Sequence, residues 1–273
     1  MDGRMKISVL IPTRDNVGHL RNCLLSLIDA EKNSDCDIEV LVLDGSSKDQ
    51  LKDVLSTRTG LADLSWCPVE QWWNYSRINN YGVKHATGDY LLLLNDDCYV
   101  GPRFFSDFMQ RAHVTELEAE KPAIHAPLLI TSTERVQSCG FTVKQGGGPL
   151  PIAFNTPIEW LNPARSFKPA TVSFSCALMR RSLYVELGGL NPDYYFGLED
   201  TDFCLRAWAA GHPSIVHTTV HCLHDGAASN DVKNEYFPRA NPVHNFTIFS
   251  RNWTPETLKP IYEKMDAIGV DHA

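Results

Sequence analysis

The sequence of 273 residues lacks both the long apolar run of a membrane span and the leading apolar stretch of a secretory signal. A transmembrane helix needs about 20 mostly apolar residues, whereas the longest runs here, such as residues 90–94, are far shorter. Residues 1–6 lead directly into an expected strand, with no apolar core of a signal peptide before it. We therefore expect no transmembrane segment and a cytoplasmic location, with peripheral attachment to a membrane left open.

Cysteine pairs at the spacing of metal or redox motifs are also absent. The eight cysteines are scattered, and no two of them are three residues apart. In a chain of this length, such spacing is typical of reduced, mostly buried thiols rather than of a disulfide framework. A basic excess is missing as well, because 33 acidic residues outnumber 25 basic ones and give a formal net charge of −8. We expect no nucleic-acid partner, since proteins that bind nucleic acid usually carry a basic surface.

A glycine-rich GxGxxG turn, the signature of a dinucleotide-binding site, does not follow the first expected strand, which argues against a dehydrogenase. What the first hundred residues do contain is an alternation of short apolar runs with segments of helical periodicity. Strands are expected at residues 6–12, 38–43, 64–69 and 90–94, and helices at residues 17–28, 48–57 and 75–86. The alternation predicts an α/β fold with a mostly parallel sheet covered by helices on both faces.

After residue 100 the alternation becomes less regular. A helix is expected at residues 104–120, a strand at 123–129 and a hairpin or antiparallel strand at 136–144, followed by a loop rich in glycine and proline from residue 146. The later expected elements are a strand at 172–179, helices at 181–187 and 200–210, a strand at 214–220, and a helical C-terminal segment from about residue 231.

Three of the expected strands end in polar residues, several of them acidic. Residues 12–15 follow the first strand, Asp44 ends the second, and Asn95-Asp96-Asp97 follows the fourth. Ligands of open α/β sheets bind beyond the carboxyl ends of the strands, and oxygen ligands suit Mg²⁺ and Mn²⁺. The pattern favours a metal-assisted site at this edge, whereas helix caps and turns explain each position equally well when it is taken alone.

Three acidic residues, Glu199, Asp200 and Asp202, open the helix expected near residue 200, directly after the aromatic residues 194–196. Capping and the helix dipole are one explanation for acids at this place. The other is catalysis, with Asp200 as the general base for a hydroxyl group. The dipole would lower the pKa of Asp200, whereas crowding by other acids would raise it. The sequence leaves that direction open, and it leaves the aromatic residues open between core packing and a sugar site.

Four histidines lie close together at positions 212, 217, 221 and 224. Zinc sites use histidine pairs at short spacing, but no second cluster of ligands accompanies these residues. A structural zinc site is therefore disfavoured. His224 stands in a His-Asp-Gly sequence after a strand, where it is either a polar loop residue or a partner of Asp97 in a metal site.

Taken in order along the chain, these segments resemble the inverting GT-A-type glycosyltransferases of family two, and among them the bacterial rhamnosyl-type transferases. The likeness spans residues 6 to about 230. It is carried, in family order, by residues 7–15, 42–49, 74–90, 94–97, 136–140, 179–181 and 187–190, by the helix that opens with Glu199 and Asp200, and by His224.

The resemblance implies a Rossmann-like fold in which a mixed, mostly parallel sheet is flanked by helices. It implies a catalytic domain over residues 1–230 and a helical extension over residues 231–273. Within the catalytic domain, residues 1–100 would form the nucleotide-binding half and residues 101–230 the half that carries the acceptor site and the catalytic base.

The resemblance also implies roles for individual residues in binding the donor. Asp44 would accept a hydrogen bond from the nucleotide base, and Arg77 would offset the charge of the diphosphate. Asn95 stands where the family has the first acid of its metal-binding triplet, so Asp97 is the expected direct ligand of Mn²⁺ or Mg²⁺. The full donor set is Pro12, Thr13, Asp15, Asp44, Arg77, Asn80, Asn95 and Asp96.

For the reaction itself, Asp200 matches the family's catalytic base, with Glu199 beside it, and His224 matches a late histidine that joins the metal site in some relatives. The residues expected near the acceptor and the transferred sugar are Ser175, Cys176, Tyr195 and Phe196.

These roles predict an inverting glycosyltransferase of the kind used in polysaccharide biosynthesis. It would move a sugar from a UDP-, dTDP- or GDP-linked donor to a hydroxyl group of a carbohydrate or other acceptor. The cation would neutralise the departing diphosphate while Asp200 takes the hydroxyl proton. Two alternatives stay open: a metal-dependent phosphohydrolase that transfers to water, and a catalytically silent protein that only binds a sugar nucleotide.

Overall fold

The computed structural model describes residues 4–46, 60–69, 74–143, 148–161, 166–195, 197–226 and 242–269. The helix expected at residues 48–57 and the first residues of the C-terminal segment, 231–241, lie outside these ranges. None of the helices within them combines the length and the apolarity that crossing a membrane requires.

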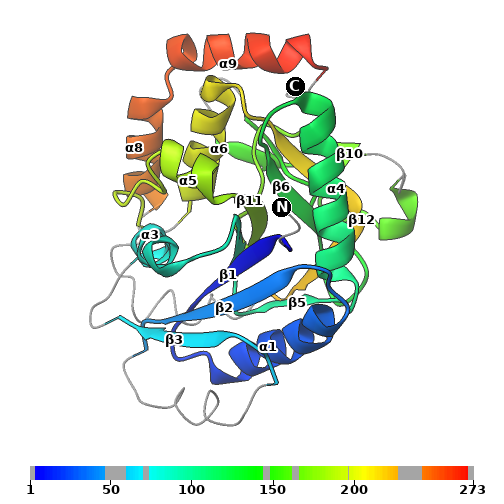
Figure 1. Cartoon of the computed structure of the whole chain (residues 1–273). Helices are drawn as coiled ribbons and strands as arrows, with labels where there is room; N and C mark the ends of the chain where they lie inside the picture. Colours follow the sequence, from blue (N-terminus) through cyan, green and yellow to red (C-terminus); the bar gives the residue numbers. More distant parts are fainter. Residues whose placement is uncertain are drawn as a thin grey trace.

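One mixed sheet forms the centre of the molecule (Figure 1). Neighbouring strands follow the order β10-β12-β6-β11-β4-β1-β2-β3. β1 pairs in parallel with β2 and β4, β2 pairs in parallel with β3, and β6 with β12, whereas β11 is antiparallel to both β4 and β6. The bounds are β1 Lys6–Thr13, β2 Asp37–Asp44, β3 Leu64–Pro68, β4 Tyr90–Leu94, β6 Ile124–Ile130, β10 Ser166–Phe167, β11 Cys176–Arg180 and β12 Ser214–His224. The predicted mixed, mostly parallel sheet is confirmed.

Helices cover both faces of this sheet, because successive strand residues point to opposite sides. In β1, Ile7 and Val9 pack with α1 (Val17–Lys32) and α4 (Phe104–Ala119), whereas Leu10 packs with the opposite set of helices. That set is α3 (Tyr75–His85), α5 (Arg181–Glu186) and α6 (Glu199–Ala210), and Figure 1 shows the two sets on the two sides of the sheet. Each face therefore buries its own apolar layer.

Two C-terminal helices, α8 (Pro242–Asn252) and α9 (Pro255–Ala267), pack on α6 (Figure 1). Phe249 of α8 and Leu258 and Ile261 of α9 bury their side chains with Leu205 and Trp208 of α6. The described part of the C-terminal segment is thus helical, as the sequence predicts, and it is joined to the main body through an apolar cluster.

Several elements differ from the expected ones after residue 130. The segment expected as a hairpin forms β7 (Val136–Ser138), which pairs with β6, and β8 (Phe141–Val143), which pairs with β9 (Pro149–Pro151). The strand expected from residue 172 begins only at Cys176, and the expected loop contains β9, a short 3-10 helix at Ile158–Trp160, and β10. Short strands at the margin of a sheet depend on their partners, so local periodicity does not reveal them.

The last strand, β12, runs four residues further than expected and thereby reaches the carboxyl edge of the sheet. Its pairing with β6 jumps from His217 to His221, so residues 218–220 form an irregular insertion. Beyond it, β12 pairs with β5 (Cys98–Val100), and His224 lies opposite Cys98. This pairing brings the end of the last strand beside the acidic residues that follow β4.

Candidate active site and metal centre

The polar strand ends meet at one edge of the sheet because β1, β2, β4 and β12 all run in the same direction. Thr13 and Asp44 are the last residues of β1 and β2 and lie in register with each other. Thr13 donates a hydrogen bond from Oγ1 to Asp96, with 2.6 Å between the two oxygens. The structure therefore brings these two side chains together although they lie 83 residues apart in the sequence.

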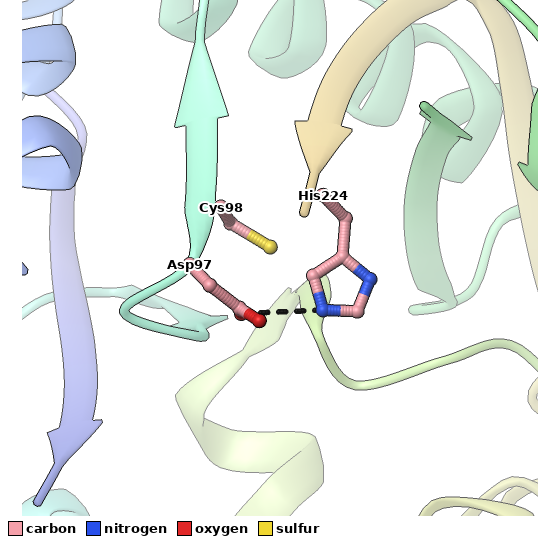
Figure 2. Close-up of side chains that lie close together, drawn as sticks. All are labelled: Asp97, Cys98 and His224. Carbon is pink, nitrogen blue, oxygen red and sulfur yellow. Dashed lines mark ion pairs between the residues drawn. The ribbon is translucent and has the colours of Figure 1, made fainter. Parts of the chain in front are cut away.

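Asp97 and His224 lie side by side at this edge (Figure 2). Asp97 Oδ1 lies 3.2 Å from His224 Nε2, and the backbone joins them again because the N–H of Asp225 donates to the carbonyl of Asp97. Burial by itself raises the pKa of the Asp97 carboxyl, but the hydrogen bond and charge of His224 outweigh it and hold the pKa below its ordinary value. Asp97 is thus an anion that faces a ring nitrogen.

The donor atoms around Asp97 fit a divalent cation. A carboxylate oxygen and an imidazole nitrogen are ordinary ligands of Mn²⁺, and their 3.2 Å separation allows both to reach one ion. Cys98 adds a sulfur, and one ligand atom from each of the three residues lies within 4.8 Å of the others. Figure 2 shows the three side chains converging from β5 and from the end of β12. Cys98 is fully buried and donates to the carbonyl of Ser175, so Asp97 and His224 are the two ligands the geometry favours.

Gln137 completes the surroundings of His224, and the sequence analysis assigned it no role. Its Oε1 lies 2.6 Å from Nδ1 of His224. The segment 136–140 carries the family resemblance, but nothing in its spacing indicates that the amide reaches a histidine 87 residues away.

Asp96 points towards the first helix rather than along the edge. Its carboxylate accepts from Thr13 and from the side-chain amide of Asn16, the residue before α1. Burial and the neighbouring charge of Asp97 raise the pKa of Asp96 to about 7, against the lowering effect of these hydrogen bonds. Asn16 is therefore a further residue of the site, next to the residues 12–15 that the sequence indicated.

The loops that follow β1 and β2 are tied together. Gly45 donates its backbone N–H to the carbonyl of Thr13 at 2.9 Å, and Asp15 donates its own to Ser46 Oγ at 2.8 Å. Asp15 has φ of 50°, a left-handed conformation unusual outside glycine. Asp44 accepts from the Ser46 N–H and from the Trp66 indole. The four residues expected in the nucleotide pocket near these loops, Pro12, Thr13, Asp15 and Asp44, are neighbours in space.

Asn80 is engaged by residues after α5, and the roles of Arg77 and Asn80 in binding the donor stay predictions. Asn80 accepts from the Tyr184 hydroxyl at 2.6 Å and from Leu190 N at 2.9 Å, and it donates to the carbonyl of Leu190. Its amide is used to hold the turn after α5. Arg77 is exposed on α3 and lines a shallow cavity of about 360 Å³ with Asn80, Tyr81, Lys84 and Pro192. Helical spacing places residues 77, 80, 81 and 84 together on the outer face of α3.

Glu199 and Asp200 stand at the start of α6, and burial decides their ionisation. Asp200 Oδ1 accepts from the Thr201 N–H at 2.7 Å, and the carboxylate also accepts from the N–H of Phe174. Burial still raises the pKa of Asp200 above its ordinary value. Burial and the nearby charge of Asp200 raise the pKa of Glu199 to about 8, and its Oε2 has no hydrogen-bond partner among the described residues. The desolvation expected to oppose the helix dipole is the larger effect.

One short segment before β11 joins Asp200 to the acidic residues after β4. Phe174 donates its N–H to Asp200, and the next residue, Ser175, accepts from the Asn95 N–H at 2.8 Å and from the Asn95 amide at 3.3 Å. Tyr75, at the start of α3, donates its hydroxyl to the Phe174 carbonyl. Asn95 and Asp200 therefore contact adjacent residues, so the two acidic groups share one wall.

The residues expected near the sugar lie in different surroundings. Ser175 lies at the shared wall, whereas Cys176 is 0% exposed and packs in the apolar layer with Cys98 and Cys222. The alternation of β11 turns its side chain to the core, and its assignment to the sugar site stays a prediction. Tyr195 is partly buried and donates its N–H to the side chain of Asn245 in α8. Phe196 lies outside the described residues.

The other three histidines of the C-terminal cluster are engaged elsewhere. His212 Nδ1 lies 3.0 Å from the carbonyl of Pro122, His217 Nε2 lies 3.0 Å from His125 Nδ1, and His221 Nε2 lies 2.9 Å from the carbonyl of Thr218. Within the described ranges these rings form no common zinc site.

Comparison with known proteins gives a family match, related proteins and solved structures with a similar fold. The family model described as "Glycosyl transferase family 2" matches residues 8–188, about two thirds of the chain. The chain is 25% identical over 274 aligned residues to the "O-antigen biosynthesis protein RfbC" of Myxococcus xanthus. The alignment covers 95% of this chain and 20% of that protein. It is 24% identical to the "Uncharacterized protein y4gI" of Sinorhizobium fredii, covering 96% and 29%. The chain therefore spans less than a third of the length of these two relatives.

Solved structures with the same fold include GalNAc-T7 with UDP, GalNAc and Mn²⁺, which matches with a TM-score of 0.64 at 14% identity. That match covers 82% of this chain and 44% of the other. The mannosyltransferase PcManGT from Pyrobaculum calidifontis, in complex with GDP-Man and Mn²⁺, has a TM-score of 0.62 at 16% identity and covers 99% of this chain and 72% of its own. At these identities the likeness establishes a common fold.

Proposed function

The chain belongs to glycosyl transferase family 2, and on that premise we propose that it transfers a sugar from a nucleotide-diphosphate sugar to a hydroxyl group of an acceptor. The observation that carries the proposal is the wall at Phe174 and Ser175. Phe174 contacts Asp200, and Ser175 contacts Asn95, which stands two positions before Asp97. The proposed leaving-group site and proton acceptor would then lie in one place, which a displacement at a sugar carbon requires.

Asp97 and His224 would hold the divalent cation. When bound, Mn²⁺ or Mg²⁺ supplies positive charge that stabilises the diphosphate as it leaves. Two observations support this assignment: the 3.2 Å separation of the two ligand atoms, and the Mn²⁺ named with two structures of the same fold. The loops around Thr13 and Asp44 would bind the nucleotide, since they lie beside this pair at the carboxyl edge.

Asp200 would act as the general base. The acceptor oxygen attacks the anomeric carbon of the donor, the bond from that carbon to the diphosphate oxygen breaks, and Asp200 takes the hydroxyl proton. One displacement of this kind inverts the anomeric centre. A base is most effective when its pKa lies near the working pH, and burial shifts the pKa of Asp200 in that direction. Glu199 beside it would keep the local charge low while it stays protonated.

We further propose the division of labour expected from the sequence. Residues 1–100 would bind the donor nucleotide, residues 101–230 would supply the acceptor side with Ser175 and Tyr195 near the sugar, and residues 231–273 would form an extension. The contacts of Phe249, Leu258 and Ile261 with α6 support the extension as a brace for the helix that carries Asp200. The donor is proposed as UDP-, dTDP- or GDP-linked, and UDP and GDP-Man occur with structures of the same fold.

The test is thermal unfolding in the presence of UDP-, dTDP- and GDP-sugars, each with and without Mn²⁺. We expect one donor class to raise Tm by several degrees only when Mn²⁺ is present, because ligands that bind the folded state stabilise it in proportion to the logarithm of their concentration over Kd. Equal shifts with and without Mn²⁺ would contradict the proposed metal centre. Consumption of the stabilising donor with no acceptor present, at the rate seen with acceptors, would indicate a phosphohydrolase instead.

A further inference from the structure

Gln137 occupies an irregular position in β7. In the antiparallel pairing with β6, Ser138 lies opposite Leu129 and Val136 lies opposite Ile130. Two steps along β7 therefore correspond to one step along β6, and Gln137 is the extra residue of a β-bulge. Bulges bend a strand and redirect a side chain, and they are frequent beside active sites. The bulge frees Gln137 from the pairing of the sheet.

The redirected amide meets the ring of His224. Gln137 Oε1 lies 2.6 Å from Nδ1, while the other ring nitrogen, Nε2, lies 3.2 Å from Asp97 Oδ1. An amide oxygen only accepts hydrogen bonds, so Nδ1 must carry the proton in this contact. When the ring is neutral, its lone pair is then on Nε2, which faces the carboxylate of Asp97. Two electron-rich atoms at that distance repel each other unless a second ring proton or a metal cation lies between them.

The backbone leaves space for this amide. Gly226, two residues after His224, has φ of 66°, and a Cβ atom placed there would lie 2.7 Å from Gln137 Nε2 and 3.8 Å from Cε1 of His224. A side chain at this position would push the amide away from the ring. The bulge on one side and the glycine on the other both favour the same contact.

We propose that Gln137 is a positioning residue for the metal centre: it holds His224 with Nδ1 protonated and with Nε2 available to a divalent cation shared with Asp97. The identity of the cation rests on the proposed function, whereas the contact itself does not. Hydrogen-bond partners of metal-bound histidines fix the tautomer and the ring orientation, and their loss typically weakens metal binding about 10- to 100-fold. An apolar side chain at position 137 would leave the ring free to rotate and to change tautomer.

The first experiment compares Mn²⁺ binding by wild type, Gln137→Met, Gln137→Glu and Ser138→Ala, measured by electron paramagnetic resonance of free Mn²⁺. Methionine has a similar length and no acceptor oxygen, so we expect Kd to rise about 10-fold or more. Glutamate keeps the oxygen and should bind Mn²⁺ at least as tightly as wild type. Ser138→Ala changes the neighbouring buried residue of the same bulged strand and should leave Kd unchanged. Equal Mn²⁺ affinity of Gln137→Met and wild type would overturn the proposal.

A double-mutant cycle separates positioning from a general loss of structure. In a His224→Ala background, Gln137→Met should cause no further loss of Mn²⁺ affinity, because the residue acts only through the ring. Full additivity of the two effects would count against the proposal.

A measurement without metal distinguishes this inference from the proposed function. In metal-free protein, at a pH where the ring is neutral, nitrogen-15 shifts of His224 should show protonated Nδ1 in wild type and a changed tautomer ratio in Gln137→Met. If wild type takes up no Mn²⁺, the proposed metal dependence is wrong and the tautomer alone decides the role of Gln137. Identical tautomers in both proteins would refute the positioning role even if Mn²⁺ binds.

Discussion

Buried carboxylates lie at both edges of the central sheet, and their surroundings differ in kind. At the amino edge, Glu39 of β2 accepts from the backbone and hydroxyl of Thr87, from the hydroxyl of Ser8 and from Lys6. Burial would raise its pKa, but the hydrogen bonds from Ser8 and Thr87 outweigh burial and lower the pKa to about 2. At the carboxyl edge, burial raises the pKa of Asp96, Glu199 and Asp200.

Glu116, near the end of α4, repeats the pattern of the amino edge. It accepts from the Tyr90 hydroxyl at 2.8 Å and from Arg180 Nε at 2.7 Å, and His125 Nε2 lies 3.5 Å away. Burial opposes ionisation, but the partners His125, Tyr90 and Arg180 prevail and lower the pKa to about 2. Carboxylates whose partners belong to the protein hold the fold together. Carboxylates with fewer donors from the protein can still bind a ligand or exchange a proton, which is typical of functional sites.

The largest effect we predict is on turnover by Asp200→Asn. Removing the base while keeping the shape should lower kcat about 1,000-fold, since general-base catalysis contributes roughly 100- to 10,000-fold. Tm and its increase on donor binding should stay close to those of wild type, because asparagine has the same shape and keeps an oxygen that can accept from the Thr201 N–H. Steady-state kinetics with the stabilising donor checks this, and a variant that turns over at the wild-type rate would exclude Asp200 as the base.

The next largest effect is the loss of stability in Glu116→Gln. This variant leaves Arg180 and His125 without their anionic partner, and breaking a buried ion pair costs about 3 kcal/mol. Urea unfolding at neutral pH measures the free energy, and kcat of the folded enzyme should be unchanged. If kcat fell together with stability, the two edges would not be separable as we describe.

The same residue contributes to the loss of stability in acid. Because the folded-state pKa of Glu116 is lowered to about 2, its contribution is present above the unfolded pKa of about 4.5 and is lost as pH falls from there towards about 2. Wild type should lose stability over this window, and Glu116→Gln should lose about 3 kcal/mol less of it. Parallel curves for the two proteins would contradict this account.

The last predicted effect has the opposite sign. The folded-state pKa of Glu199 is raised to about 8, so its protonated form favours the fold, and this stability declines as pH rises from about 4.5 towards about 8. Glu199→Gln is permanently neutral and should be more stable than wild type at pH 8 and equal to it at pH 4. Urea unfolding at the two pH values checks this. A destabilised variant at pH 8 would mean that Glu199 belongs with the paired carboxylates.

Much of the sheet could be predicted because its information is local. The apolar residues of β4 are followed directly by Asn95, Asp96 and Asp97, and a buried strand that ends in acids must present them at an edge. The sequence also predicted that Asp97, His224 and Asp200 act together, through resemblance to a family rather than through any rule of spacing. The direction of the Asp200 pKa could not be predicted, because it depends on desolvation by residues from other elements.

The side-chain contacts that the sequence did not reveal share that cause. Asn80 and Cys176 are polar or reactive residues close to predicted site segments, yet contacts across the molecule turn the amide to Leu190 and the thiol to the core. Gln137 was missed for the converse reason, since a bulge and a glycine bring it to a histidine far along the chain.

The order of residues along the chain was sufficient to specify the buried strands, the acidic strand ends and the helices between them, because hydrophobic periodicity and capping act over a few neighbouring residues. Only the folded molecule decides which of the acids receive enough hydrogen bonds and ion pairs from the protein and which receive few. Ionisation of a buried group depends on the balance between lost hydration and the donors packed around it, and those donors come from strands and helices that meet only when the sheet is assembled.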